Sequence, residues 1–305
     1  MPELPEVERT TRDLQKTVLG KTIETCWSNY VSDKYKNKPE IKNSEFFVNF
    51  KKKIKGTDIV SASRRGKNIL INLSSGQTIH IHLKMTGHLL CGKYTFSKKD
   101  SHWKATEQGP LTQDPFNQYI HFMITFTDGS HLAMSDMRKF AKITLFETSK
   151  TEEHLKELGP EPFDSAVTPR IFMKQLNKKP SWNIKTALMN QELIVGVGNI
   201  YSDEALFLSK IHPEIKVRDI PMSKFASLLK YTRQVMKEGV DLIDTSRSDY
   251  RRLDGTVAQF TEPNNVYRRT GNSCSQKNCR GVIERKIVNG RSAHYCPVCQ
   301  ETPKA

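Results

Sequence analysis

The sequence predicts an α+β protein with several domains: a β-rich first domain, a helical second domain and a small metal-binding tail. Three observations lead to this prediction. Short runs of alternating apolar and polar residues fill 57–146, helical periodicity follows after 162, and four cysteines gather within 274–299. A chain of 305 residues is long enough for two or three domains with cores of their own.

The first three residues, Met1-Pro2-Glu3, are a candidate covalent catalyst. Removal of Met1 would leave a secondary amine on Pro2. An α-amino group titrates near a pKa of about 8, so roughly a tenth of it is neutral at pH 7. A neutral amine adds to an aldehyde carbon to form an iminium, and the neighbouring Glu3 is placed to move protons. The alternative interpretation is that Pro2 only begins a strand or loop.

A short amphipathic helix is predicted directly after this opening. Pro5 lies near its start, Leu14 belongs to its apolar face, and Gly20 marks its end, so we expect a helix over 5–19. Such a helix would hold Pro2 and Glu3 at its mouth.

Antiparallel hairpins are predicted for most of the rest of the first domain. The runs 69–73 and 78–83 are joined by Ser-Ser-Gly, and 119–126 and 131–134 are joined by a turn with Asp-Gly. Between these hairpins, 91–118 lacks periodicity, so we expect it to be a long exposed loop.

A hinge is predicted at 158–162, where Leu-Gly-Pro-Glu-Pro interrupts any regular element. The apolar pattern beyond it is helical, and one helix is predicted from about Ser223 to a stop at Gly239. Residues 240–262 form a second poorly patterned loop. The sequence therefore predicts a helical second domain.

The segment Gly196-Val197-Gly198-Asn199 resembles a phosphate loop, but Tyr201 stands where a dinucleotide fingerprint requires its third glycine. A tight turn that leads into a helix from Ile200 is the better interpretation. The backbone amides at such a helix start, together with the Asn199 side chain, are available for a phosphate. An ordinary turn between helices is the alternative.

The cysteine array has the spacing C-x4-C-x16-C-x2-C, which allows four thiolates to surround one Zn²⁺ ion tetrahedrally. We expect one structural zinc ion, held by Cys274, Cys279, Cys296 and Cys299. Disulfides are the alternative, but the chain starts without an apolar secretory segment. The interval between the two pairs ends in Gly290-Arg291-Ser292, which predicts a hairpin tip that presents an arginine or, alternatively, only a solvated basic turn.

The charge balance points to a polyanionic partner. Forty-eight Lys and Arg residues exceed 33 Asp and Glu residues, which gives a net charge of +15. Nucleic acid is the leading candidate, and a basic protein without such a role is the alternative. No run of roughly twenty apolar residues is present, so we expect a soluble protein in a reducing intracellular compartment, with no membrane partner.

Several other residues are ambiguous when taken singly. A lysine such as Lys67, at the start of a strand, is usually only solvated, and Met85 and Phe140 would ordinarily belong to a core.

Four separated motifs, in this order along nearly the whole chain, nevertheless resemble the formamidopyrimidine-DNA glycosylase family. They are the opening Met-Pro-Glu-Leu-Pro-Glu-Val-Glu, the Arg65-Gly66-Lys67 segment, the 195–201 segment Val-Gly-Val-Gly-Asn-Ile-Tyr, and the cysteine array. The resemblance implies an N-terminal antiparallel β-sandwich with flanking helices, a helix-two-turn-helix domain and a C-terminal zinc-finger β-hairpin. On this basis we place the domains at 1–158, 159–264 and 265–305.

The resemblance also implies a bifunctional DNA glycosylase and abasic-site lyase, acting as a monomer on damaged double-stranded DNA. Pro2 would attack C1′ of a damaged nucleotide, and Glu3 would handle the accompanying protons. Lys67 would assist β-elimination and Arg291 δ-elimination. It further implies phosphate contacts by His82, Lys179, Lys185, Asn199 and Tyr267, and a wedge that fills the gap left by the flipped base, made of Met85, Arg138 and Phe140.

This chain departs from the family's pattern in four places. The first cysteine pair is separated by four residues rather than two, Ala141 replaces a frequent glycine, 91–118 is longer than usual, and 240–262 lies where relatives cap the extruded base. The Leu4 opening and the complete wedge favour oxidised purines, including 8-oxoguanine and formamidopyrimidines. The alternatives are an endonuclease VIII-like enzyme for oxidised pyrimidines and a damage-binding protein without catalysis.

Overall fold

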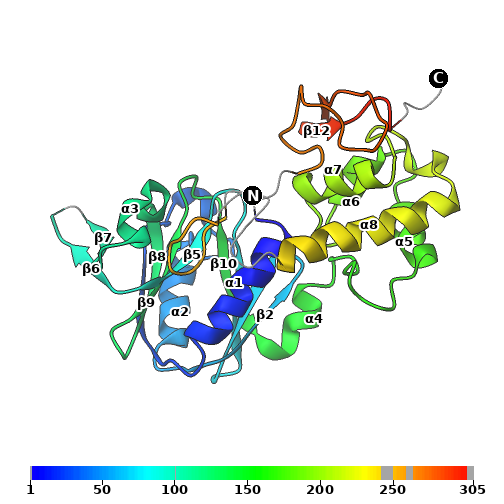
Figure 1. Ribbon diagram of the computed structural model, residues 1–305. Coiled ribbons are helices and arrows are strands. Elements are labelled where there is room, and N and C mark those ends of the chain that lie inside the picture. Colours follow the sequence, from blue (N-terminus) through cyan, green and yellow to red (C-terminus); the bar gives the residue numbers. More distant parts are fainter. Residues whose placement is uncertain (1, 100, 242–249, 259–263, 301–305) are drawn as a thin grey trace. The chain divides into compact units, whose positions relative to one another are not determined.

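The computed structural model describes residues 2–99, 101–241, 250–258 and 264–300 (Figure 1). These residues form two compact units, and the chain passes between them more than once. The described part of the first unit comprises Pro2, 6–99, 101–155 and 250–258, and that of the second comprises 3–5, 156–241 and 264–300. None of the helices in these ranges is both long enough and apolar enough to cross a membrane.

Two four-stranded antiparallel sheets form the centre of the first unit. One sheet has the order β1 (Ile23–Ser28), β8 (Ile120–Phe126), β9 (His131–Ser135) and β5 (His88–Gly92). The other has the order β10 (Lys142–Glu147), β4 (Gln77–His82), β3 (Asn68–Leu73) and β2 (Ile59–Arg65). Residues from both sheets, such as Ile81 and Phe122, share a single apolar core. The predicted β-sandwich is therefore confirmed.

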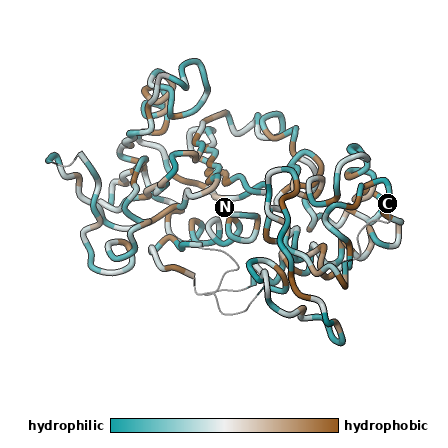
Figure 2. Tube along the Cα trace, turned by 90° about the horizontal axis from the view of Figure 1, so that it is seen from above, coloured by the Kyte–Doolittle hydropathy of each residue, from teal (hydrophilic) through white to brown (hydrophobic). Residues whose placement is uncertain are grey.

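Helices cover the edges of this core. Helix α1 (Leu4–Thr17) buries Val7 and Leu14 in it, as the apolar spacing predicts, and α2 (Ser44–Ile54) adds Phe50. Figure 2 shows hydrophobic stretches interrupted by hydrophilic ones along the trace, as expected for elements with one buried face. Other short helices of this unit are η1 (Asp33–Tyr35), η3 (Thr148–Lys150) and α4 (Thr151–His154).

The prediction of an unstructured loop over 91–118 is wrong. This segment contains a hairpin of β6 (Tyr94–Ser97) and β7 (His102–Ala105), followed by α3 (Pro110–Gln113) and η2 (Pro115–Gln118) (Figure 1). Aromatic packing stabilises the hairpin, because the ring centroids of Phe96 and Trp103 lie 5.3 Å apart and that of Trp27 lies 5.8 Å from Phe96. The strands are too short to show periodicity in the sequence, so only these cross-strand contacts reveal them.

The same insertion contacts residues 250–258, which belong to the second predicted loop. Arg251 forms a largely buried ion pair with Asp114, with Nε 2.6 Å from Oδ2, and its guanidinium lies 4.6 Å from the Phe116 ring centroid. Asn117 donates from Nδ2 to the carbonyl of Gly255 at 2.9 Å. The 91–118 insertion and the 250–258 segment, two departures from the family pattern, are thus joined to each other. Apart from residues 240 and 241 at the end of α8, the rest of 240–262 lies outside the described residues.

The second unit is built from helices around one core, with a hairpin at its C-terminal side (Figure 1). Its elements are α5 (Pro169–Leu176), α6 (Ile184–Met189), α7 (Asn199–Leu208), η4 (Val217–Asp219), α8 (Met222–Asp241), β11 (Glu284–Val288) and β12 (Arg291–Tyr295). The stop predicted at Gly239 is wrong, because α8 continues through it. A Cβ atom at Gly239 would lie 2.3 Å from the Tyr201 hydroxyl, so this glycine permits close packing of α7 and α8.

Candidate active site

The carboxylate of Glu3 lies at the N-terminus of α7. Glu3 is 1 % exposed, and its oxygens accept hydrogen bonds from the backbone amides of Ile200 at 2.8 Å and Tyr201 at 3.5 Å. The amides in the first turn of an α-helix need acceptors from outside the helix, and the helix dipole favours a negative charge beside them. We expected a phosphate on these amides, whereas the structure places the protein's own carboxylate there.

Two glycines make room for this arrangement. A Cβ atom at Gly198 would lie 2.3 Å from the carboxyl carbon of Glu3, and one at Gly196 would lie 2.5 Å from Cδ1 of Leu4. Gly196 also has a φ of +94°, which residues other than glycine rarely adopt. The glycine pattern therefore serves the approach of the N-terminal residues. Because Pro2 is bonded directly to Glu3, the fixed position of Glu3 limits where the Pro2 nitrogen can lie.

A buried chain of charged groups connects α7 with α6 and β12. Lys185 of α6 is 1 % exposed and its ammonium is paired with Asp203. The other oxygen of Asp203 accepts from the backbone amide of His294 at 3.0 Å, and the ring Nδ1 of His294 lies 3.1 Å from it. Burial lowers the pKa of Lys185, and the carboxylates of Asp203 and Glu3 oppose that shift. The phosphate contact predicted for Lys185 stays a prediction, since its ammonium faces Asp203 here.

Glu204, the next residue of α7, organises the segment before the cysteines. Its buried carboxylate accepts from the backbone amides of Asn265, Val266 and Tyr267 at 2.8 to 3.0 Å. Burial raises the pKa of the Tyr267 hydroxyl, the charge of Arg268 opposes this shift, the charge of Glu3 adds to it and a hydrogen bond with Asn199 opposes it. Tyr267 therefore lies near both Glu3 and Asn199. Sequence reasoning missed Asp203, Glu204 and His294. The available signal was a pair of adjacent acids inside an otherwise apolar helix.

Asn199 and Arg291 are also placed in this region. The Nδ2 atom of Asn199 lies 3.3 Å from the Ser292 hydroxyl, which ties the start of α7 to the hairpin. Arg291 is exposed at the first position of β12, after a turn in which Asn289 and Gly290 have positive φ values. Its charge contributes to lowering the pKa of Lys185. The second unit thus gathers Glu3, Lys185, Asn199, Tyr267 and Arg291, while Lys179 lies on its surface.

In the first unit, Lys67 and His82 are neighbours. Lys67 is only 4 % exposed, so the expectation of a solvated lysine is wrong. It lies in the turn between β2 and β3. Burial, with the charges of Lys84 and Lys67, lowers the pKa of His82 to about 3. His82 is therefore neutral at pH 7 in the free protein, and a neutral ring would meet a phosphate as a hydrogen-bond donor.

The three predicted wedge residues lie together on the first unit. The Nη1 atom of Arg138 lies 3.1 Å from the Met85 sulfur, and its guanidinium carbon lies 4.5 Å from the Phe140 ring centroid. Met85 is 37 % exposed and Phe140 is 45 % exposed, so the ordinary assignment of these side chains to a core is wrong. Two large apolar side chains are thus presented to solvent around one guanidinium.

The fully buried Asp136 holds the backbone beneath this wedge. It accepts hydrogen bonds from the amide of Ala141 at 2.7 Å and that of Arg138 at 3.3 Å. The hydroxyls of Thr86 and Tyr30 donate to the same carboxylate. The sequence contains no local pattern that marks Asp136 for this task.

The four cysteines of the array form one cluster. Their sulfur atoms all lie within 4.8 Å of one another, and the closest pairs are 3.6 and 3.7 Å apart. A disulfide requires about 2.05 Å between sulfurs, whereas tetrahedral Zn–S bonds of about 2.3 Å require roughly 3.8 Å between them. Backbone amides of Gln276 and Gly281 donate to the sulfurs of Cys274 and Cys279 at 3.4 Å. The donor set therefore fits one metal ion.

Known proteins share both the sequence and the fold of this chain. The family model described as the formamidopyrimidine-DNA glycosylase N-terminal domain matches residues 1–143, and that of the H2TH domain of the same enzyme matches 158–250. The chain belongs to the formamidopyrimidine-DNA glycosylase family. The formamidopyrimidine-DNA glycosylase of Bacillus cereus is 35 % identical over 302 residues, covering 98 % of this chain and 99 % of the relative. That of Pelotomaculum thermopropionicum is 34 % identical over 304 residues, covering 99 % of each.

Solved structures of formamidopyrimidine-DNA glycosylases give the same result. The Lactococcus lactis enzyme in complex with DNA that contains an abasic site has a TM-score of 0.80 and 28 % identity, covering 99 % of this chain and 100 % of that one. A MutM complex with DNA that contains carbocyclic 8-oxo-G has the same TM-score, identity and coverage. The helix-two-turn-helix and zinc-finger-like parts of the predicted fold are therefore confirmed as a formamidopyrimidine-DNA glycosylase architecture.

One departure from the formamidopyrimidine-DNA glycosylase pattern has a visible packing consequence. Ala141, which replaces a frequent glycine, is buried, and its Cβ atom lies where a Cβ atom on Gly87 would approach to 3.2 Å. Gly87 also comes so close to the Leu83 carbonyl that a side chain there would meet it at 2.5 Å. The methyl group of Ala141 is thus accommodated by a glycine on the neighbouring loop.

Proposed function

We propose that this chain is a base-excision-repair enzyme that removes oxidised purines from duplex DNA and then cleaves the abasic strand. The observation that carries the proposal is the Glu3 carboxylate, desolvated and held by the α7 amides directly beside Pro2. A group that must exchange protons during catalysis gains from fixed geometry and the exclusion of water. Relatives support the substrate class, since Lactococcus lactis Fpg has been solved with Fapy-dG DNA and MutM with carbocyclic 8-oxo-G DNA.

In the proposed first step, the neutral Pro2 nitrogen attacks C1′ of the damaged nucleotide. The new N–C1′ bond forms, the glycosidic bond breaks, and the departing base takes up a proton. Glu3 accepts the proton that the Pro2 nitrogen loses after its attack and delivers it to O4′ as the sugar ring opens, which leaves an iminium between Pro2 and C1′. This electron-poor carbon acidifies the C2′ proton.

Two eliminations follow in the proposal. Lys67 assists removal of a C2′ proton as the 3′-phosphate leaves, and Arg291 assists the second elimination, in which the 5′-phosphate leaves. Hydrolysis of the remaining imine releases the sugar fragment and restores the Pro2 amine. The strand is then interrupted by a gap with a phosphate on each side.

The proposed DNA contacts divide into phosphate contacts and a wedge. The basic and polar side chains assigned to phosphates fix the position of the duplex rather than read its sequence. Those residues are His82, Lys179, Lys185, Asn199 and Tyr267. Met85, Arg138 and Phe140 would enter the space vacated by the flipped nucleotide, with Arg138 facing the orphaned cytosine. Filling that space offsets the few kcal/mol that flipping costs.

We further propose that the metal of the cysteine cluster is a structural Zn²⁺ ion, because four protein thiolates leave no open coordination position for catalysis. Four thiolates require a reducing compartment, so we propose that the protein works inside the cell, wherever the genome lies. We also propose that it acts as a monomer. A chelator is expected to unfold 274–299 and to weaken DNA binding, as measured by far-UV circular dichroism and by anisotropy. An unchanged spectrum and affinity after verified metal loss would refute the structural role.

Borohydride trapping tests the proposed chemistry. One duplex carries 8-oxoguanine opposite cytosine and a second carries an oxidised pyrimidine opposite a purine. We expect a covalent adduct on the first duplex, and we expect Pro2→Gly to lose most trapping while it keeps specific binding. Wild-type trapping by that variant would exclude Pro2 as the nucleophile.

The second duplex tests the alternative functions. One Lactococcus lactis complex contains oxidised-pyrimidine DNA, so an adduct on both duplexes would mean a broader substrate range. An adduct only on the second would favour the endonuclease VIII-like alternative. Binding without any adduct would favour a damage-binding protein that lacks catalysis.

A further inference from the structure

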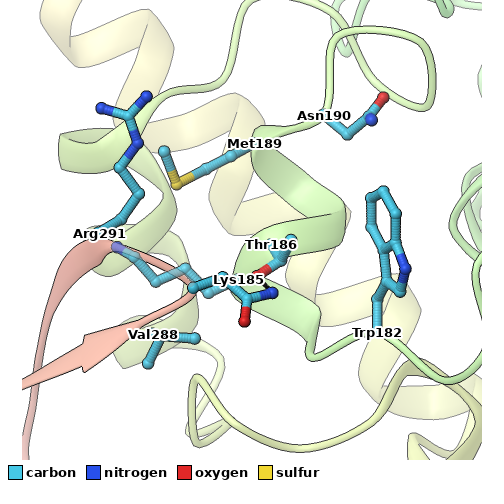
Figure 3. A pocket seen from close by; sticks show the side chains of 8 residues that line it. Trp182, Lys185, Thr186, Met189, Asn190, Val288 and Arg291 are labelled. Carbon is cyan, nitrogen blue, oxygen red and sulfur yellow. Dashed lines mark hydrogen bonds between the residues drawn. The ribbon is translucent and has the colours of Figure 1, made fainter.

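A pocket of about 270 Å³ lies between α6 and the tip of the β11–β12 hairpin, within the second unit (Figure 3). Its apolar wall is made by Trp182, Met189 and Val288, and its polar groups include Asn190, Asn289 and Arg291. Figure 3 shows Trp182 and Arg291 on opposite sides of this space, with Met189 and Thr186 between them. Lys185 and Arg291, which also line the pocket, have roles in the proposed reaction, whereas Trp182 has none.

The pocket combines a planar aromatic group with a positive charge that is not neutralised. Among the described residues, none forms a hydrogen bond or ion pair with the guanidinium of Arg291, and no acidic side chain lines the pocket. Lys185 also lines it, but its charge is compensated by Asp203. A second cation lies close to the indole ring: Nζ of Lys179 is 5.2 Å from the ring centroid of Trp182.

These features select an anion that carries a flat ring. Arginine binds phosphate oxygens in a bidentate manner, and aromatic side chains stack on nucleobases without regard to sequence. The volume is just below the usual range of roughly 300 to 1,000 Å³ for ligand sites, so the pocket suits a small ligand such as one nucleotide.

We propose that this pocket binds a single phosphorylated nucleotide, with its base against Trp182 and its phosphate against Arg291. The inference rests on the proposed function, in which elimination leaves a gap with phosphorylated strand ends. A terminal nucleotide beside such a gap has an unpaired neighbour and can leave the stack more easily than one inside a duplex. The pocket thereby retains the product through its terminal nucleotide.

A gapped duplex with phosphates on both sides of a one-nucleotide gap tests this assignment. Binding is measured by anisotropy at one fixed salt concentration for the wild type, Trp182→Ala and Trp182→Phe. We expect the alanine variant to bind this duplex about tenfold more weakly, because one stacking contact is lost, and the phenylalanine variant to stay within about threefold of wild type. The same duplex with hydroxyl ends and an intact undamaged duplex are expected to show little dependence on Trp182.

Free dAMP distinguishes a strand end from a free nucleotide as the source of the ligand. The chain has three tryptophans, so the fluorescence change on adding dAMP is compared between wild type and Trp182→Phe. Saturable quenching that depends on Trp182 would show that a free nucleotide suffices. Absence of quenching, together with the tenfold effect on the gapped duplex, would assign the pocket to strand ends.

The pocket and the chemistry can fail separately. Equal binding of the phosphorylated gap by wild type and Trp182→Ala, with no Trp182-dependent quenching, would overturn the pocket proposal even if Pro2 trapping succeeds. Conversely, a Trp182-dependent preference for phosphorylated gaps would uphold it even if no covalent adduct forms on any damaged duplex.

Discussion

The surroundings of α7 and the wedge of the first unit handle polar and apolar groups in opposite ways. Around α7, Glu3, Lys185 and Asp203 are almost fully buried, and each has a charged or amide partner. In the wedge, the apolar Met85 and Phe140 stand in solvent around Arg138. One region buries charges, which is costly unless they are paired, and the other exposes apolar surface.

The difference follows from when each region makes its contacts. Burying a charge costs free energy during folding, so its partners must be present in the free protein, and the geometry is then fixed before substrate arrives. Exposed apolar side chains such as Met85 and Phe140 mark an interaction surface, and under the proposed function they would gain their contacts when DNA covers them. The α7 region is therefore preorganised, whereas the proposed wedge would gain its contacts only in the proposed complex with DNA.

Gly198→Ala is the strongest way to break the preorganised region. The new methyl group would lie 2.3 Å from the Glu3 carboxyl carbon, so the carboxylate must leave the α7 amides. A displacement of about 1 Å can reduce a reaction about a hundredfold, so we expect a loss of that size in trapping rate under single turnover.

The matched control for this variant is Gly129→Asn, at an open turn with a φ of +77° that asparagine tolerates. It should trap as the wild type does. Normal trapping by correctly folded Gly198→Ala would show that the position of Glu3 does not matter to the reaction.

Phe140→Ala tests the wedge. Because the ring is already exposed, we expect the thermal midpoint to change little, while affinity for lesion-containing duplex falls about tenfold through lost stacking. Val48→Ala, at a 67 % exposed position on α2, is the control and should leave both quantities unchanged. A large loss of stability with unchanged lesion affinity would mean that Phe140 stabilises the folded protein and does not contribute to DNA binding.

The smallest predicted effect concerns His82. Its pKa of about 3 in the folded protein lies below the usual value of about 6.5, so the unfolded state binds more protons between these pH values. The stability that a neutral His82 contributes is therefore fully present above pH 6.5 and is lost as pH falls toward 3.

Denaturant titration at pH 7.5 and pH 5 measures this effect. The wild type should lose about 1 to 2 kcal/mol more of unfolding free energy between the two pH values than His82→Gln does. An identical pH dependence of the two proteins would mean that the pKa of His82 is the same in the folded and unfolded states.

Sequence patterns predicted most of the fold because periodicity and spacing act locally. The helix over Leu4–Thr17, the paired strands of the sandwich and the cysteine cluster all follow from such patterns. The hairpin inside 91–118 escaped prediction because its two strands have only four residues each and depend on contacts with Trp27.

The candidate site was predictable only in part, because sequence patterns are local and some of its contacts join residues that are far apart in the chain. Residues such as Pro2, Glu3 and Arg291 belong to recognisable motifs, whereas the residues that support them do not. Asp203 acts through His294, 91 positions away, and Asp136 acts through backbone amides of its own turn and a hydroxyl 106 positions away. Such partners are chosen by tertiary structure, and no local spacing marks them.

Peptide mapping of the borohydride-reduced adduct tests the central claim most directly. The protein is trapped on a duplex with 8-oxoguanine opposite cytosine, digested, and examined by mass spectrometry for the peptide that carries the sugar remnant. The account predicts modification of the Pro2 nitrogen, on a chain that has lost Met1, and strong depletion of that peptide in Gly198→Ala. A remnant on a lysine such as Lys67, with Pro2 unmodified, would contradict it.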